Sequence, residues 1–204
     1  MALATYSDLT ASVAAWLNRT DLTAIIPDFV TIAEAHHSRD LRMRKQITST
    51  ILPTSAGVRG VALPSDFLEF ENLSILTSPE RQITYCTVEQ LDSVYPNNGQ
   101  TGVPSLYTIE ADQILFGAVP DAVYSVSALY YARFPSVITN STNWLLTNHP
   151  TAYLYAALMQ ANIFLKDKSA AAEFKSLYDT VIKDLQTQDD RAQHSGSTLR
   201  VRRV

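Results

Sequence analysis

The stretch from Pro150 to about Gln188 constrains the fold more than any other, because it predicts two consecutive helices with different surroundings. Residues Thr151 to Leu165 are nearly all apolar or aromatic, which is typical of a helix buried on most sides. The second helix has an exposed face with a predicted ion pair between Asp179 and Lys183. Its buried stripe is predicted from spacings of three and four, at Ala171, Phe174, Leu177, Tyr178, Val181 and Leu185. We therefore expect a helical hairpin whose first member is covered by another part of the chain.

The N-terminal 46 residues are predicted to form the helices that cover this hairpin. Ser7 is a natural N-cap, and the helix after it places Leu9, Val13, Trp16 and Leu17 on one face. The segment Asn18-Arg19-Thr20-Asp21 ends this helix and caps a second one, and Pro27 starts a third. In the third helix the expected stripe is Phe29, Ile32, Ala33 and His36. The two ends of the chain should thus form one helical bundle.

The middle of the chain, residues 47–140, predicts antiparallel β-structure punctuated by proline and glycine. Ile47–Leu52 is one expected strand and Val58–Leu63 its return strand. Thr87 should cap a short helix, and Val123–Phe134 is expected to be the longest strand. The alternation along this last segment suits an antiparallel sheet with one drier face.

The fold class expected is therefore α+β, mainly α, with four parts. These are the N-terminal helices (1–46), a β-rich insertion (47–140), a C-terminal helical hairpin (141–192) and an extended C-terminal tail (193–204). Asp189 to Ser197 is polar and is expected to leave the bundle without helical structure. Leu199 to Val204 alternates arginine with leucine and valine, a pattern that suits addition of a strand to a partner's sheet.

Composition excludes some classes of protein. The 204 residues carry a net charge of −4, which disfavours general affinity for nucleic acid. The single cysteine, Cys86, rules out an intrachain disulfide. The sequence does not begin with a signal peptide pattern. The apolar helix is shorter than the run of about 20 apolar residues that spans a bilayer. We therefore expect a protein that is made in a cytoplasm and has no membrane contact.

Catalytic and metal-binding patterns are incomplete. Glu34-Ala35-His36-His37 contains one Glu-x-x-His pair, whereas a di-iron carboxylate site needs two such pairs and two further glutamates. We expect these residues to be polar groups of a helix surface, with His36 at the edge of the core. Asp66, Glu69 and Glu71 cluster after a strand and could imitate a glycosidase pair, but such clusters are more often solvated turn residues. A hydrolase using these carboxylates is the weakest hypothesis, and no cofactor is expected.

Two basic clusters could contact partners. Arg39, Arg42, Arg44 and Lys45 lie at the end of the third predicted helix, where cations interact favourably with the helix dipole. A binding module that contacts DNA through this cluster is the main alternative function. The second cluster is the tail, with Arg200, Arg202 and Arg203.

Several stretches, in order, resemble the family of tailed-bacteriophage head-to-tail adaptor (connector or head completion) proteins. The N-terminal stretches are Tyr6-Ser7-Asp8-Leu9, Trp16-Leu17-Asn18-Arg19-Thr20-Asp21-Leu22, Ile26-Pro27-Asp28-Phe29, Ala33-Glu34 and Leu41-Arg42. Those of the middle are Leu63-Pro64-Ser65-Asp66-Phe67-Leu68-Glu69, Pro104-Ser105-Leu106-Tyr107, and Ile114-Leu115-Phe116 with Pro120. At the end they are Asn143-Trp144-Leu145-Leu146, His149-Pro150 and Tyr153-Leu154-Tyr155-Ala156-Ala157-Leu158. Loop 97–102 and the tail depart from the resemblance.

The resemblance implies a virion structural protein located at the head–tail junction. Such adaptors form a ring, typically a dodecamer, beneath the portal protein, and their far side receives a tail tube or nozzle protein. C-terminal extensions of the family reach toward the portal, so the residues expected to dock there are Leu199, Arg200, Val201, Arg202, Arg203 and Val204. DNA could pass through such a ring without sequence-specific contacts, and the family carries no catalytic residues or obligatory cofactor.

Overall fold

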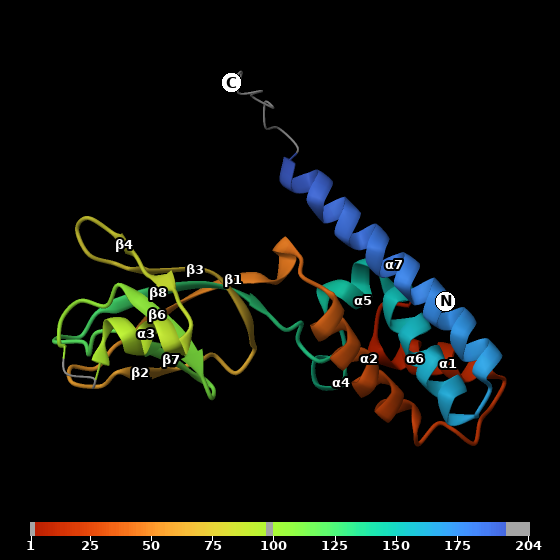
Figure 1. Cartoon of the computed structure of the whole chain (residues 1–204). Helices are drawn as coiled ribbons and strands as arrows, with labels where there is room; N and C mark the ends of the chain where they lie inside the picture. Colours follow the sequence, from red (N-terminus) through yellow and green to blue (C-terminus); the bar gives the residue numbers. More distant parts are fainter. Residues whose placement is uncertain (1–2, 97–99, 195–204) are drawn as a thin grey trace. The chain divides into compact units, whose positions relative to one another are not determined.

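The computed structural model describes residues 3–96 and 100–194 and shows an α+β fold. The chain divides into two compact units (Figure 1). The helical unit comprises residues 1–44 and 134–204, and the β unit comprises residues 45–133. The two ends of the chain thus belong to one unit and the middle forms the other.

The helical unit is built around one central helix. Its helices are α1 (Tyr6–Leu17), α2 (Ile26–Asp40), α4 (Val137–Asn140), α5 (Trp144–Asn148), α6 (Pro150–Phe164) and α7 (Lys168–His194). Helix α6 packs against α1, α2, α5 and α7, and nine of its residues are buried. This confirms the buried helix that the apolar sequence after Pro150 predicts, since a helix without a polar face needs neighbours around it.

The N-terminal helices differ from the prediction in three respects. Thr5, rather than Ser7, is the N-cap of α1, and it exchanges hydrogen bonds with Asp8 in a capping box. Two helices are present instead of three, because residues 18–25 form turns between α1 and α2. The buried stripe of α2 includes His37 in place of the expected His36, and Ile32 is exposed.

The C-terminal helix α7 corrects the prediction that Asp189 leaves the bundle. The helix continues to His194, and Asp189 accepts hydrogen bonds from the backbone N–H and the Nε of Arg44. This contact holds the turn of α7 around Asp189 in place, although the polar sequence of that turn gave no reason to expect packing. On the exposed face Asp179 pairs with Lys175 and not with Lys183, and within the predicted stripe Leu177 is 39% exposed.

The described residues of the β unit form two four-stranded sheets (Figure 1). The first has the order β1-β8-β3-β4, all antiparallel, with β1 (Ile47–Pro53), β8 (Ser125–Ala132), β3 (Phe67–Ile75) and β4 (Arg81–Gln82). The second has the order β2-β7-β6-β5, with β2 (Gly60–Ala62), β7 (Gln113–Phe116), β6 (Leu106–Glu110) and β5 (Thr84–Tyr85), and only its β5–β6 pair is parallel. The 3₁₀ turn η1 (Arg44–Gln46) precedes β1, and α3 (Val88–Val94) has the predicted Thr87 cap.

One apolar core lies between these sheets. The buried side chains of β8 and β3 that face it include Val126, Ala128 and Leu73, and they cluster with Ile114 and Phe116 of β7. The alternation predicted for residues 123–134 is thus confirmed, with Val126, Ala128 and Tyr130 on the dry face.

Two strand predictions are wrong. The predicted return strand of β1 is β2, which pairs with β7 in the other sheet. The turn after β1 therefore carries the chain across the core instead of closing a hairpin. The longest strand is β3, with nine residues against eight in β8. Among the helices of residues 3–96 and 100–194, none combines the length and the hydropathy that a membrane span requires.

Candidate interaction surfaces

The only strongly perturbed histidine of the described residues is buried inside the helical unit. His37 on α2 is 2% exposed, its ring centroid lies 4.6 Å from that of Tyr153, and its Nδ1 lies 3.3 Å from the Tyr178 hydroxyl. The Tyr178 hydroxyl donates to Asp40 at 3.2 Å. Since that hydroxyl has a single proton, Nδ1 of His37 is the donor in their contact. Burial lowers the pKa of His37 to about 3, so its ring is neutral at physiological pH.

A second buried network joins the turns before α6. Asn143 caps α5 by accepting the Leu146 N–H at 2.8 Å, and its Nδ2 donates to the Tyr153 hydroxyl at 2.7 Å. Glu34 on α2 accepts the Val137 N–H at 2.7 Å and so holds the start of α4. These polar groups satisfy backbone and side-chain partners, which indicates a structural role.

The Glu-x-x-His pair therefore has no metal-binding geometry. Glu34 is bonded to α4 and His37 to α7, so the two side chains serve different neighbours. Within the described part of the chain, no group of three or more His, Cys, Asp or Glu side chains lies together as metal ligands would.

The first basic cluster is largely engaged by the protein itself. Arg39 forms an ion pair with Asp40 at 2.8 Å, and Arg44 pairs with Asp189 at 3.2 Å. Arg42 donates to the backbone oxygens of Ser38 and Leu41, at the C-terminal end of α2. This matches the helix-end role expected of these cations. Lys45, the fourth member, belongs to the β unit, so the cluster does not form one surface of a single unit.

The carboxylate cluster does not form a paired catalytic site. Asp66 accepts the Tyr130 hydroxyl at 3.0 Å, and burial with this hydrogen bond raises the pKa of Tyr130 to about 12. Glu69 and Glu71 are exposed residues of β3, where the pairing with β8 is irregular. The three side chains thus lie on a strand and its preceding turn, as expected for solvated residues.

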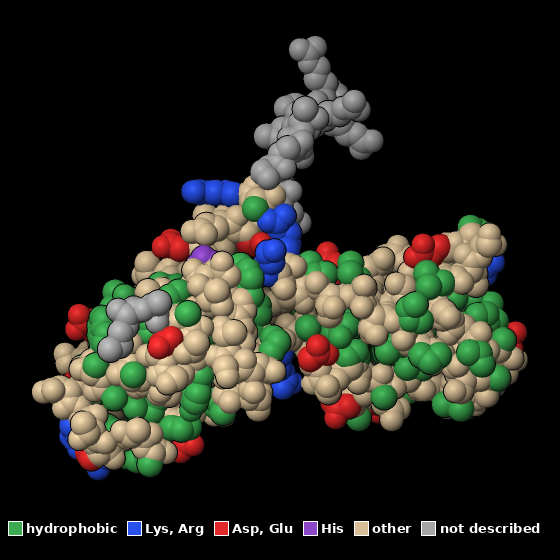
Figure 2. All heavy atoms as spheres, turned by 180° about the vertical axis from the view of Figure 1, so that it is seen from behind, with side chains coloured by type: hydrophobic (Ala, Val, Ile, Leu, Met, Phe, Trp, Pro, Cys, Tyr) green, Lys and Arg blue, Asp and Glu red, His purple; other side chains and the backbone are tan. Residues whose placement is uncertain are grey.

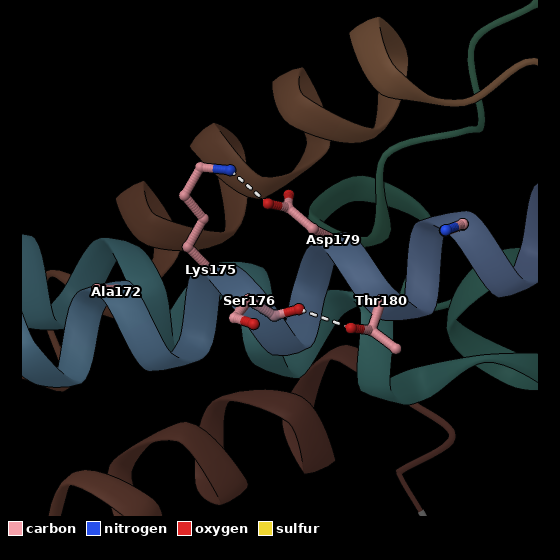
Figure 3. A pocket seen from close by; sticks show the side chains of 6 residues that line it. Ala172, Lys175, Ser176, Asp179 and Thr180 are labelled. Atoms are coloured by element: carbon pink, nitrogen blue, oxygen red, sulfur yellow. Dashed lines mark hydrogen bonds and ion pairs between the residues drawn. The ribbon is translucent and has the colours of Figure 1, made fainter.

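The outer face of α7 has a shallow depression lined by side chains of that helix alone. Figure 3 shows Lys175 directed at Asp179, and the Thr180 hydroxyl donating to the backbone oxygen of Ser176 at 2.9 Å. All the lining residues belong to successive turns of one helix. The depression therefore lacks the converging walls of a ligand pocket.

An exposed tryptophan with two partly buried aromatic neighbours is a better candidate for a surface that contacts partners. The Trp16 patch, which consists of Trp16, Tyr155 and Phe174, lies where α1, α6 and α7 meet. Trp16 is 57% exposed, and its ring centroid lies 6.5 Å from Tyr155 and 6.2 Å from Phe174. Trp16 thus faces the C-terminal hairpin, as its shared face with Leu9 and Val13 predicts, but it remains largely exposed there. Its place at the end of α1, directly before the polar segment 18–21, is the sequence signal that could have indicated exposure.

A second exposed aromatic lies at the end of α6. Phe164 is 51% exposed and packs on Phe29, with centroids 5.7 Å apart, and Ile32 is exposed one turn further along α2. Nine residues separate Tyr155 from Phe164, which corresponds to half a turn around the helix beyond two full turns. The Trp16 patch and the Phe164 site therefore lie on opposite sides of α6.

Sequence comparison decides the class of protein to which these surfaces belong. A sequence model described as SU10 adaptor protein matches residues 4–202. The chain belongs to the SU10 adaptor protein family. No curated protein matches this adaptor. The match covers both units, and it confirms the resemblance to phage head-to-tail adaptors.

Family membership makes this adaptor a structural protein of the virion that interacts with portal and tail components in general. Phage structural adaptors are not enzymes in general, and the buried networks above have structural partners. The predicted portal-docking residues, Leu199, Arg200, Val201, Arg202, Arg203 and Val204, lie outside the described residues.

Proposed function

We propose that this adaptor forms a ring that joins the capsid portal to the tail of a tailed phage. The observation that carries the proposal is the family match over residues 4–202. A ring requires a heterologous contact, in which one surface of each copy meets a different surface of the next. In this proposal Trp16 and Phe164 belong to the two surfaces, because both side chains are apolar and more than half exposed and they lie on opposite sides of α6.

In this proposal the C-terminal segment Leu199 to Val204 docks on the portal protein. Its alternating sequence suits pairing with a strand, while Arg200, Arg202 and Arg203 meet acidic groups. A charge-assisted hydrogen bond contributes about 1.5–3 kcal/mol, and repetition around a ring turns weak docking into strong attachment. The β unit then faces the next tail component, a nozzle or tail tube protein, and DNA passes through the ring without sequence-specific contacts.

The alternative of a DNA-binding module through Arg39, Arg42, Arg44 and Lys45 gains no support from the structure. The first three cations already bind protein oxygens. A DNA-contacting cluster would instead present guanidinium groups to phosphates.

Deletion of Ser197 to Val204 tests the portal contact. The shortened chain should keep its unfolding temperature, because the deletion begins beyond α7, and it should no longer cosediment with purified portal rings. Cosedimentation that survives the deletion would remove the C-terminal segment from the mechanism. A chain that never cosediments with the portal, with or without the deletion, would contradict the adaptor function itself.

A further inference from the structure

Strand β1 is an edge of the first sheet, and its backbone orientation follows from two hydrogen bonds. Among the strands of the described residues its one neighbour is β8, in the order β1-β8-β3-β4. The Thr54 N–H donates to the oxygen of Tyr124, its direct partner in the continued register. Hydrogen-bonded pairs alternate in antiparallel sheets, so Thr48, Thr50 and Leu52 bond to β8. The backbone groups of Ser49 and Ile51 consequently point to the free edge.

The opposite side of β8 supports this assignment. The Leu76 N–H donates to the oxygen of Ser125, so Ser125, Ser127 and Leu129 bond to β3. The residues of β8 that alternate with these three therefore bond to β1. This agrees with the hydrogen bond between Thr54 and Tyr124. Pro53, which has no N–H, occupies an edge-directed position of β1, where proline costs no sheet hydrogen bond.

This edge has few of the features that prevent other strands from pairing with it. Natural edges carry charged side chains, bulges or very short strands. The seven residues of β1, Ile-Thr-Ser-Thr-Ile-Leu-Pro, include no charged residue and pair with β8 without a register shift. None of the seven is buried, and Ile51 is 60% exposed. The other edge of this sheet, β4, is two residues long and contains Arg81.

The charge of the β unit indicates what kind of segment fits there. Residues 45–133 contain four Lys and Arg against nine Asp and Glu, a net charge of −5, whereas the whole chain carries −4. Figure 2 shows acidic side chains spread over the visible face of this unit, where basic ones are sparse. A strand added at β1 would also bring apolar side chains beside Ile51 at alternate positions.

We propose that the β1 edge binds an extended segment of a partner protein whose side chains alternate between apolar and basic. The segment extends the sheet by one strand, with backbone hydrogen bonds to Ser49 and Ile51 and charge attraction to the acidic unit. The assignment of this segment to the next tail component rests on the proposed adaptor function. The binding property itself belongs to the isolated chain.

Amide hydrogen exchange in the full chain tests the proposal, with a capped peptide of alternating valine and lysine as the probe. A peptide of alternating valine and glutamate is the matched control. At a valine–lysine concentration about nine times its dissociation constant, exchange at Ser49 and Ile51 should slow about tenfold, because only a tenth of the edges remain free. Exchange at Thr48 and Thr50, whose N–H groups already bond to β8, should change little.

Two variants separate backbone pairing from side-chain contact. Ile51→Pro removes an edge-directed N–H, which should abolish binding of the valine–lysine peptide. Ile51→Ala keeps that N–H and should retain most of the binding. If Ile51→Pro fails to fold, the exchange pattern of the unchanged protein still decides.

Three results would overturn the proposal. Exchange at Ser49 and Ile51 that neither peptide slows would exclude strand addition, and equal slowing by both would exclude the basic character. Slow exchange in the full chain without peptide, relieved by deletion of Ser197 to Val204, would show that a copy's own C-terminal segment occupies the edge. Cosedimentation of the full chain with the portal is a separate measurement that does not use either peptide, so failure of this proposal and failure of the adaptor function can be told apart.

Discussion

His37 and Tyr178 are 141 residues apart in the chain, yet Nδ1 of the histidine lies 3.3 Å from the hydroxyl of the tyrosine. This contact joins α2 to α7 and so connects the two ends of the chain inside the helical unit. The other ring nitrogen, Nε2, is buried and has no hydrogen-bond partner among the described residues. Protonation of His37 would place a charge there without a nearby solvent shell.

The buried histidine should make the helical unit sensitive to acid. The pKa of His37 in the folded chain is about 3, below the ordinary histidine value of about 6.5, so the unfolded chain takes up the proton first as the pH falls. The contribution of His37 to the free energy of unfolding is therefore fully present above about pH 6.5. It declines by about 1.4 kcal/mol per pH unit between about pH 6 and 4. The other titratable groups around the ring are His36, Asp40, Tyr153 and Tyr178.

Urea unfolding at a series of pH values measures this dependence. His37→Gln should flatten the curve between about pH 6 and 4 while it lowers stability at pH 7. His36→Gln is the matched control, because His36 is only partly buried and should leave most of the slope. An unchanged slope in His37→Gln would show that other groups cause the acid sensitivity.

Asn143 should be among the most important polar residues for stability. Replacement by alanine removes the cap of α5 and leaves the buried Tyr153 hydroxyl without its donor. We expect Asn143→Ala to cost about 2–4 kcal/mol of unfolding free energy, since an N-cap contributes about 1 and an unsatisfied buried group about 1–3. Asn140→Ala, at an exposed position, should cost about 0.5 kcal/mol or less in the same chemical denaturation experiment. Equal losses in the two variants would contradict the role assigned to Asn143.

The Trp16 patch should contribute to association and little to folding. Trp16→Ser removes an exposed ring that touches Tyr155 and Phe174, so we expect a stability loss of about 1 kcal/mol. Assembly into rings with the portal, followed by sedimentation velocity, should be impaired. Val123→Ser removes an apolar side chain that is 70% exposed on the β unit and serves as the control. Normal ring assembly by Trp16→Ser would exclude this patch from the contact between copies.

Charge reversal in the C-terminal segment tests the electrostatic part of portal docking. The triple change Arg200→Glu, Arg202→Glu and Arg203→Glu should weaken portal binding more strongly than Arg191→Glu, which alters an exposed residue of α7. Binding of the unchanged chain should also weaken with added salt, because exposed charge pairs are screened. Similar affinity for both variants, measured by surface plasmon resonance on immobilised portal, would contradict a charge-dependent contact.

The sequence predicted best those elements whose pattern reflects burial. The apolar run from Thr151 to Leu165 predicted a central helix, and the alternation along residues 123–134 predicted the dry face of β8. Both succeed because burial on all sides, or on one face, leaves a direct record in the order of apolar residues.

Long-range contacts explain where the predictions failed. Asp189 lies in a polar stretch, yet a hydrogen bond from Arg44 keeps it in α7. The loop after β1 could close a hairpin, yet β2 pairs with β7 across the core. Trp16 has the spacing of a buried residue, yet it lies exposed at the end of α1. Local patterns cannot specify such partners, which are distant in the sequence.

Of the candidate sites, the sequence correctly predicted that the carboxylate cluster is a surface feature. The sequence did not identify His37 as the buried histidine. His36 and His37 are adjacent, and a shift of the buried face of α2 by one residue position decides which of them is buried. The portal-docking role of residues 199–204 stays a prediction.

Quantitative mass spectrometry of purified phage particles tests the adaptor function most directly. A ring with one copy of this chain per portal subunit predicts a fixed molar ratio of about one in complete particles, and absence of the chain from tail-less empty capsids. Absence of the chain from complete particles would contradict the proposed function.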